Sequence, residues 1–127
     1  MRALLDTHSF LWFIAGDEKL SEHAKLLIED EETELLMSIA SVWEMAIKTS
    51  LGKLTLAQPF DELPTHIEQN KIKILPIKVE HTILVAKLPF HHRDPFDRLI
   101  IAQALVEHLP IIGIDAMFDA YGIKRLW

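Results

Sequence analysis

Four acidic residues, Asp6, Glu44, Asp97 and Asp115, stand at positions from which their side chains could share one site. Asp6 and Asp115 each close a short, almost wholly apolar run, while Glu44 and Asp97 lie near the start of segments suited to helices. Carboxylates gathered at short range repel one another, and a divalent cation such as Mg²⁺ or Mn²⁺, which prefers oxygen ligands, relieves the repulsion. Such an ion positions water and stabilises charge during phosphodiester hydrolysis.

Helix capping is the alternative explanation for these acids. The stretch "SVWE", which ends at Glu44, has the S-x-x-E form of a capping box. In "DPFD", Asp94 fits an N-cap, the proline a first helical position and Asp97 the third position. An Asp that ends a strand is also a common turn residue. Capping explains each acid singly but not their shared position, and we expect Asp94 to be a cap first and an auxiliary metal ligand second.

The elements that must position these acids alternate along the chain. Strands are predicted at 2–6, 33–40, 71–77 and 110–115, with a short edge strand at 124–127. Helices are predicted at 7–16, 22–30, 41–52, 59–71 (with a break at Pro64), 78–89 and 94–109. Apolar strands that alternate with helices predict a central parallel sheet of four to five strands, covered by helices on both faces. Ligands of such sheets bind at the carboxyl ends of the strands, where we expect the four acids.

The composition excludes several classes of protein. A chain of 127 residues, half of them hydrophobic, predicts a single domain over 1–127 with a real core. The absence of cysteine excludes disulfides and thiolate metal sites and suits a cytoplasmic location. No segment has the length of a membrane span, and the N-terminus is not a signal peptide. The net charge of −6 argues against a basic nucleic-acid binder but allows an enzyme that meets nucleic acid through a cation.

Four stretches in combination resemble the PIN-domain family, and within it the VapC-type toxins of bacterial toxin–antitoxin pairs. They are "LLDTHSFLW" (4–12), "SIASVWEMAIKTSLGKL" (38–54), "HRDPFDRLIIAQA" (92–104) and "IIGIDAMFDAYGI" (111–123). The resemblance implies a three-layer α/β/α fold and Mg²⁺- or Mn²⁺-dependent endoribonuclease activity. It also implies an RNA substrate, a small antitoxin protein as partner, and a homodimer.

The resemblance assigns the catalytic, metal-binding acids to Asp6, Glu44, Asp97 and Asp115. The family often has Thr or Ser two residues before the last acid, and this chain has Gly113 there, so a hydroxyl that would support Asp115 is missing.

Other polar and aromatic residues near these motifs receive weaker predictions. Thr7 is expected to hydrogen-bond around the site. We expect three aromatic residues in the core, namely Trp43, Phe96 and Phe118. We expect three histidines on the surface or in loops rather than on a metal, namely His8, His91 and His92. Three basic residues are expected either to bind phosphates or to lie in solvent, namely Lys48, Arg93 and Arg98.

Two other classes of function compete with the ribonuclease. A phosphoacceptor signalling domain also gathers acids at the carboxyl edge of a parallel sheet, but it pairs two adjacent acids after its first strand, where this chain has "LLDTH". A catalytically silent domain of the same fold would only bind RNA or a partner protein. For the antitoxin, we expect an Arg in the acidic pocket and a groove near Leu11, Trp12 and Leu51, although core burial also accounts for these three.

Overall fold

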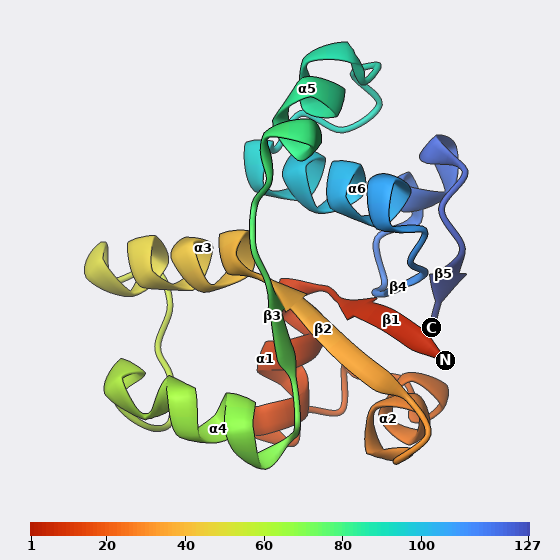
Figure 1. The fold of residues 1–127 in the computed structure, drawn as a ribbon. Helices are drawn as coiled ribbons and strands as arrows, with labels where there is room; N and C mark the ends of the chain where they lie inside the picture. Colours follow the sequence, from red (N-terminus) through yellow and green to blue (C-terminus); the bar gives the residue numbers. More distant parts are fainter.

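The computed structural model describes residues 1–127 as alternating strands and helices (Figure 1). In chain order the elements are β1 (Arg2–Leu5), α1 (Thr7–Ala15), α2 (Glu22–Glu29), β2 (Glu34–Ser38), α3 (Ile39–Ser50), η1 (Phe60–Glu62), α4 (Leu63–Gln69), β3 (Lys73–Leu75), α5 (Val79–Lys87), α6 (Pro95–Glu107), β4 (Ile111–Ile112), η2 (Ala116–Tyr121) and β5 (Arg125–Leu126), where η denotes a 3-10 helix. No helix is both long and apolar enough to cross a membrane.

The five strands form one sheet in the order β3-β2-β1-β4-β5, and every neighbouring pair is parallel. The predicted α/β fold with a parallel sheet of four to five strands is therefore confirmed. Because all the strands run the same way, their carboxyl ends meet at one edge, and the segments that follow β1, β2 and β4 begin there. These segments carry Asp6, Glu44 and Asp115.

Three differences from the prediction concern the acids and the proline of α4. β4 has only two residues, so Asp115 lies beyond the end of the strand, at the N-cap of η2. α3 begins at Ile39, and Glu44 therefore lies in its second turn rather than its first. Pro64 does not break α4, because it occupies the first turn, where a missing backbone N–H costs no helical hydrogen bond.

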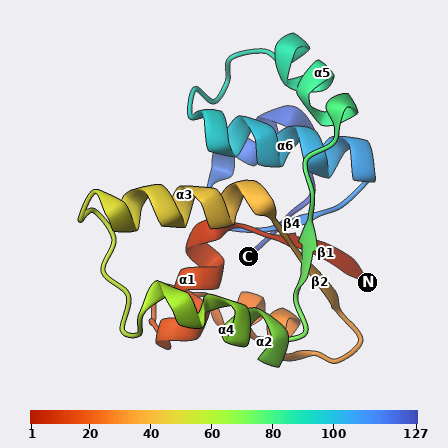
Figure 2. The ribbon, with the colours of Figure 1, turned by 60° about the vertical axis from the view of Figure 1, so that its left-hand side comes forward.

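Two apolar clusters cover the two faces of the sheet, because successive strand residues point to opposite sides. Ala3 and Leu5 pack into one cluster with residues of α1, α2, α3 and α4, while Leu4 packs into the other with α6 and η2. Figure 1 shows α5 and α6 on one side of the sheet and α1, α2 and α4 on the other. In Figure 2, α3 lies between these two helical layers, beside the ends of both.

Candidate metal centre

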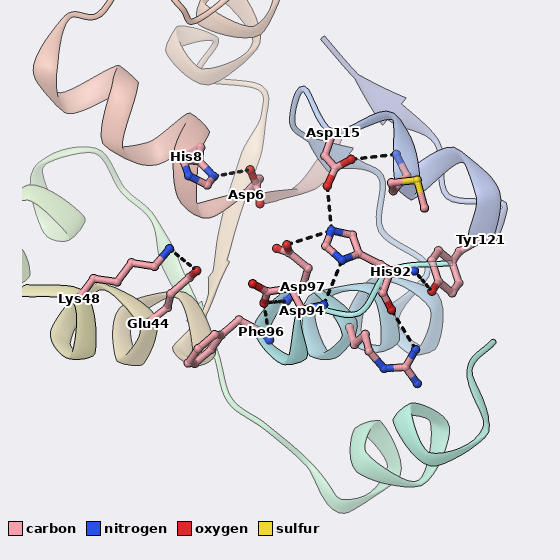
Figure 3. Close-up of polar contacts among 12 residues, drawn as sticks. Asp6, His8, Glu44, Lys48, His92, Asp94, Phe96, Asp97, Asp115 and Tyr121 are labelled. Atoms are coloured by element: carbon pink, nitrogen blue, oxygen red, sulfur yellow. Dashed lines mark hydrogen bonds and ion pairs between the residues drawn. The ribbon is translucent and has the colours of Figure 1, made fainter. Parts of the chain in front are cut away.

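The structure brings the four predicted acids to one edge of the sheet, from four separate parts of the chain. Asp6 and Asp115 are the N-cap residues of α1 and η2, Glu44 lies on α3, and Asp97 lies in the first turn of α6. Figure 3 shows the carboxyl groups of Asp6, Asp97 and Asp115 turned toward one space, with Glu44 to one side. Burial is uneven: Asp6 and Glu44 are each 4% exposed, and Asp97 and Asp115 are partly exposed.

Two of these carboxyl groups hold their protons more tightly than an ordinary aspartate. Burial raises the pKa of Asp6 to about 6, and repulsion by Glu44 and Asp115 adds to the effect, while the nearby backbone N–H groups of Thr7 and His8 oppose it. Burial also raises the pKa of Asp97 to about 7, and the charges of Asp6, Asp94 and Glu44 raise it further. The negative charges of the neighbouring carboxylates therefore act on both Asp6 and Asp97.

Glu44 supplies the clearest sign of an unmet interaction. Its Oε2 accepts a hydrogen bond from Lys48 Nζ at 2.9 Å, and this bond raises the pKa of the lysine. Its Oε1 is buried and has no hydrogen-bond partner. A buried carboxylate oxygen without a partner is costly, and a divalent cation with oxygen ligands would satisfy it. The residues present therefore fit such an ion.

The capping-box interpretation of Glu44 is wrong. The N-cap of α3 is Ser38, whose hydroxyl accepts from the backbone of Ala40 at 3.0 Å. Ser41, which the capping box would have used, instead accepts a buried hydrogen bond from the Thr7 hydroxyl at 2.8 Å. This bond ties the start of α1 to α3 beside the site, in line with the prediction for Thr7.

The structure separates the roles of the two acids in "DPFD". Asp94 is the N-cap of α6, and its Oδ1 accepts from the backbone N–H groups of Phe96 at 2.9 Å and Asp97 at 3.2 Å. The predicted cap role of Asp94 is therefore confirmed. The Asp97 carboxylate makes no capping bond of its own, which leaves it free to face Asp6 and Asp115 (Figure 3).

His92 reaches the acidic site, which the sequence did not predict. Its Nε2 lies 2.9 Å from Asp115 Oδ2 and 3.1 Å from Asp97 Oδ2. Candidate ligand atoms of the three residues all lie within 4.8 Å of one another. The only available signal was the nearness of His92 to "DPFD", since no H-x-x-x-H pattern marks it. His8 and His91 are exposed, which confirms the expected surface position, and His8 Nδ1 lies 3.9 Å from Asp6 Oδ2.

Arg98 is not available to bind phosphate, so this prediction is wrong. The residue is 5% exposed, and its guanidinium donates to the backbone oxygens of Val85, Leu88, Pro89 and His92 at 3.0–3.3 Å. It also lies over the ring of Phe90, 4.0 Å from the centroid. Arg98 therefore fixes the loop between α5 and α6. Arg93 and Lys48 remain accessible to a charged ligand.

The core assignments of the aromatic residues are not all confirmed. Phe118 is fully buried, as expected, but Trp43 is 60% exposed, so its core assignment is wrong. Trp43 packs edge-on against the partly buried Phe96, with ring centroids 5.4 Å apart. α3 turns its Met45 face toward the core, and Trp43 lies away from that face.

A cavity of about 430 Å³ adjoins the acidic site between α1, α3 and the 53–59 segment. Glu44 and Lys48 line it together with Leu11 and Trp12, so these two apolar residues do border a groove. Leu51, predicted beside them, is 61% exposed and does not line the cavity.

Comparison with known proteins places this geometry in a family. Residues 3–124 match the family model described as the PIN domain. A search of curated proteins gives no match. Among solved structures, a chain of VapBC2 from Rickettsia felis shares the fold, with a TM-score of 0.69 and 13% identity over 100% of both chains. That structure holds VapBC2 bound to a DNA fragment from its promoter. FitAcB from Neisseria gonorrhoeae gives a TM-score of 0.63 and 18% identity, covering 98% of this chain and 96% of that chain.

Proposed function

Because this chain belongs to the PIN domain family, we propose that it is a Mg²⁺- or Mn²⁺-dependent endoribonuclease and the toxin of a toxin–antitoxin pair, with residues 1–127 forming one domain. Members of this family are generally nucleases. The fold likeness to VapBC2 and FitAcB supports the toxin assignment. Cleavage of RNA and dependence on metal are the parts that experiment must establish.

One observation carries the metal dependence: the buried Glu44 Oε1 has no partner, although Glu44 lies close enough to Asp6 and Asp97 for its charge to raise the pKa of both. Asp6, Glu44, Asp97 and Asp115 are the oxygen donors that would hold the ion. Asp94 caps α6 through its Oδ1, so it contributes negative charge nearby, and its Oδ2 remains for an auxiliary contact with the ion. An all-oxygen donor set favours Mg²⁺ or Mn²⁺ over softer metals.

The reaction follows from this arrangement. Asp6, Glu44, Asp97 and Asp115 would hold a divalent cation, and the bound ion would supply activation of water and stabilisation of negative charge on the phosphate oxygens. The chain's own groups position the acids: the Thr7–Ser41 hydrogen bond joins α1 to α3, and the Met117 backbone N–H holds Asp115 Oδ1 at 2.9 Å. Lys48 balances part of the charge of Glu44. No serine or cysteine nucleophile is required, so hydrolysis proceeds without a covalent intermediate.

The proposed antitoxin site lies beside the acids. The cavity of about 430 Å³ runs from Glu44 and Lys48 to the apolar side chains of Leu11 and Trp12. A partner helix could lay its apolar face along this groove and place an Arg among the carboxylates, where a guanidinium pairs two oxygens at once. Such an Arg would compete with the metal for the same oxygens.

Two further properties belong to the proposal. We propose a homodimer, supported by the exposed Ile39 and Ile74, which both line an apolar groove near the β3 edge of the sheet. Light scattering on the purified chain measures its mass in solution. We also propose a cytoplasmic location, which agrees with the absence of cysteine.

A cleavage assay tests the function. Purified protein is incubated with a mixed RNA pool, with Mg²⁺, with Mn²⁺ or with EDTA, alongside the variants Asp97→Asn and Asp61→Asn. Asp61 is an exposed acid in η1, so its replacement matches the change in charge away from the site. We expect cleavage by wild type and Asp61→Asn with either metal, and none with EDTA or with Asp97→Asn. Metal binding without any RNA cleavage would favour the catalytically silent alternative.

A further inference from the structure

Asp115 lacks the hydroxyl that the family often places two residues earlier, and the packing around Gly113 explains why. A Cβ added at Gly113 would lie 3.1 Å from Asp6 Cβ and 3.2 Å from Phe118 Cε2, both closer than ordinary contact. A serine or threonine at this position would therefore require Asp6 or Phe118 to shift by a few tenths of an ångström. Asp115 must be oriented by another group.

His92 occupies the position of such a group. Its Nε2 lies within hydrogen-bond distance of one oxygen of Asp115 and one oxygen of Asp97. The Met117 N–H holds the other oxygen of Asp115, and no hydrogen bond occupies Asp97 Oδ1. Since each carboxylate oxygen has two lone pairs, both groups retain acceptor positions for a cation.

The backbone decides which ring nitrogen carries the proton. The Asp94 N–H donates to His92 Nδ1 at 3.2 Å, so Nδ1 presents its lone pair. In that tautomer Nε2 carries the hydrogen and donates it to Asp115 Oδ2, while Asp97 Oδ2 lies 3.1 Å from the same nitrogen as an electrostatic contact (Figure 3). Ligation of a metal by Nε2 would require the proton to move to Nδ1, where it would face the Asp94 N–H.

The loop that carries His92 is itself fixed at several points. The His92 backbone N–H donates to Tyr121 Oη at 2.8 Å, and Tyr121 Oη donates to the Pro89 oxygen at 2.7 Å. Arg98 donates to the His92 oxygen at 3.3 Å and to the Pro89 oxygen at 3.0 Å. The imidazole is 16% exposed. A donor held this firmly can set the orientation of a carboxylate.

We infer that His92 is a positioning residue and not a metal ligand. Its Nε2–H orients the Asp115 carboxylate by a hydrogen bond and keeps the Asp97 carboxylate beside it by an electrostatic contact, so that both face the cation. His92 thereby takes the place of the missing hydroxyl. The role deepens the proposed function and rests on it, because it concerns the same metal site. Supporting residues of this kind typically cost about 10- to 100-fold in metal affinity when they are removed.

Three variants separate the effect of the Nε2–H hydrogen-bond donor from the effect of the imidazole ring. In His92→Gln, the side-chain amide nitrogen can reach roughly where Nε2 lies, so a donor to the carboxylates is retained. In His92→Asn the side chain is one carbon shorter and the amide cannot reach them. His92→Ala removes the donor altogether. Mn²⁺ affinity is measured by electron paramagnetic resonance titration without RNA, and nitrogen coupling to bound Mn²⁺ is measured by pulsed resonance on wild type.

We expect His92→Asn and His92→Ala to bind Mn²⁺ about 10- to 100-fold more weakly than wild type, with His92→Gln recovering most of the loss and wild type showing no imidazole nitrogen coupling. Equal affinity in wild type and His92→Asn overturns the positioning role while leaving the metal-dependent nuclease intact. A nitrogen coupling that His92→Gln abolishes also overturns it, because His92 is then a ligand. A wild-type protein that binds no Mn²⁺ overturns both this role and the proposed metal dependence.

Discussion

Replacing Asp97 by asparagine is expected to stabilise the metal-free protein at pH 8 while it removes metal binding. Asparagine has nearly the same size, and its amide oxygen can keep the polar contact with His92 Nε2, which lies 3.1 Å from Asp97 Oδ2. The main change is the loss of a negative charge from a site where Asp6, Asp94 and Glu44 repel it. The variant therefore exchanges function for stability.

The pKa of Asp97 gives the size and the sign of the effect. Burial and the neighbouring acids raise this pKa from 3.8 to about 7 in the folded protein. Between these values the folded state binds more protons than the unfolded chain, so the stability of the metal-free protein falls as the pH rises from about 4 to about 7. A pKa difference of about 3, at about 1.4 kcal/mol for each unit, sets a ceiling of roughly 4 kcal/mol above pH 7. Asp6, whose pKa is raised to about 6, acts in the same direction.

Thermal unfolding in EDTA at pH 4 and at pH 8 measures the effect, with Asp61→Asn as the matched control. At roughly 3 °C for each kcal/mol, we expect Asp97→Asn to melt up to about 12 °C above wild type at pH 8. The difference should vanish near pH 4, where Asp97 is protonated in the folded protein. Added Mn²⁺ should raise the melting temperature of wild type but not of the variant. A variant that is less stable than wild type at pH 8, or a gain that is independent of pH, would refute the reasoning.

Three further substitutions test other parts of the site. Glu44→Gln removes the negative charge of the carboxylate whose Oε1 has no partner, so the affinity of the protein for Mn²⁺ should fall by more than the roughly 10- to 100-fold that the loss of a supporting residue costs. Calorimetric titration measures this affinity, and an unchanged value would exclude Glu44 as a ligand. Arg98→Met leaves four backbone oxygens without their donor and should lower the free energy of unfolding, measured by urea denaturation, by about 3–5 kcal/mol. The control is Arg93→Met, at an exposed arginine nearby. Equal losses in the two variants would contradict the role of Arg98 in fixing the loop between α5 and α6. Gly113→Ala forces a Cβ against Asp6 and Phe118 and should lower the free energy of unfolding by about 1–3 kcal/mol in the same assay. No measurable loss would show that Asp6 and Phe118 shift to make room.

The sequence alone predicted the alternation of strands and helices and the parallel sheet. Both follow from local patterns: continuous apolar runs form buried strands, and the "DP" of "DPFD" starts a helix, as the Asp94 cap confirms. The positions of Asp6, Glu44 and Asp115 at one edge also follow, because parallel strands share the edge at which their carboxyl ends lie.

The contacts between segments distant in sequence were decided only by the tertiary structure. Whether Arg98 meets phosphate or four backbone oxygens depends on how the loop after α5 folds over α6, which no local pattern specifies. Trp43 is exposed because of the rotation of α3 between the two layers, which packing on both sides determines. His92 reaches Asp115, 23 residues away in the chain, only because Arg98 and Tyr121 hold its loop against η2. Local sequence sets which elements form and where they begin, whereas the partners of a buried polar group depend on which segments the packed core brings within about 3 Å of it.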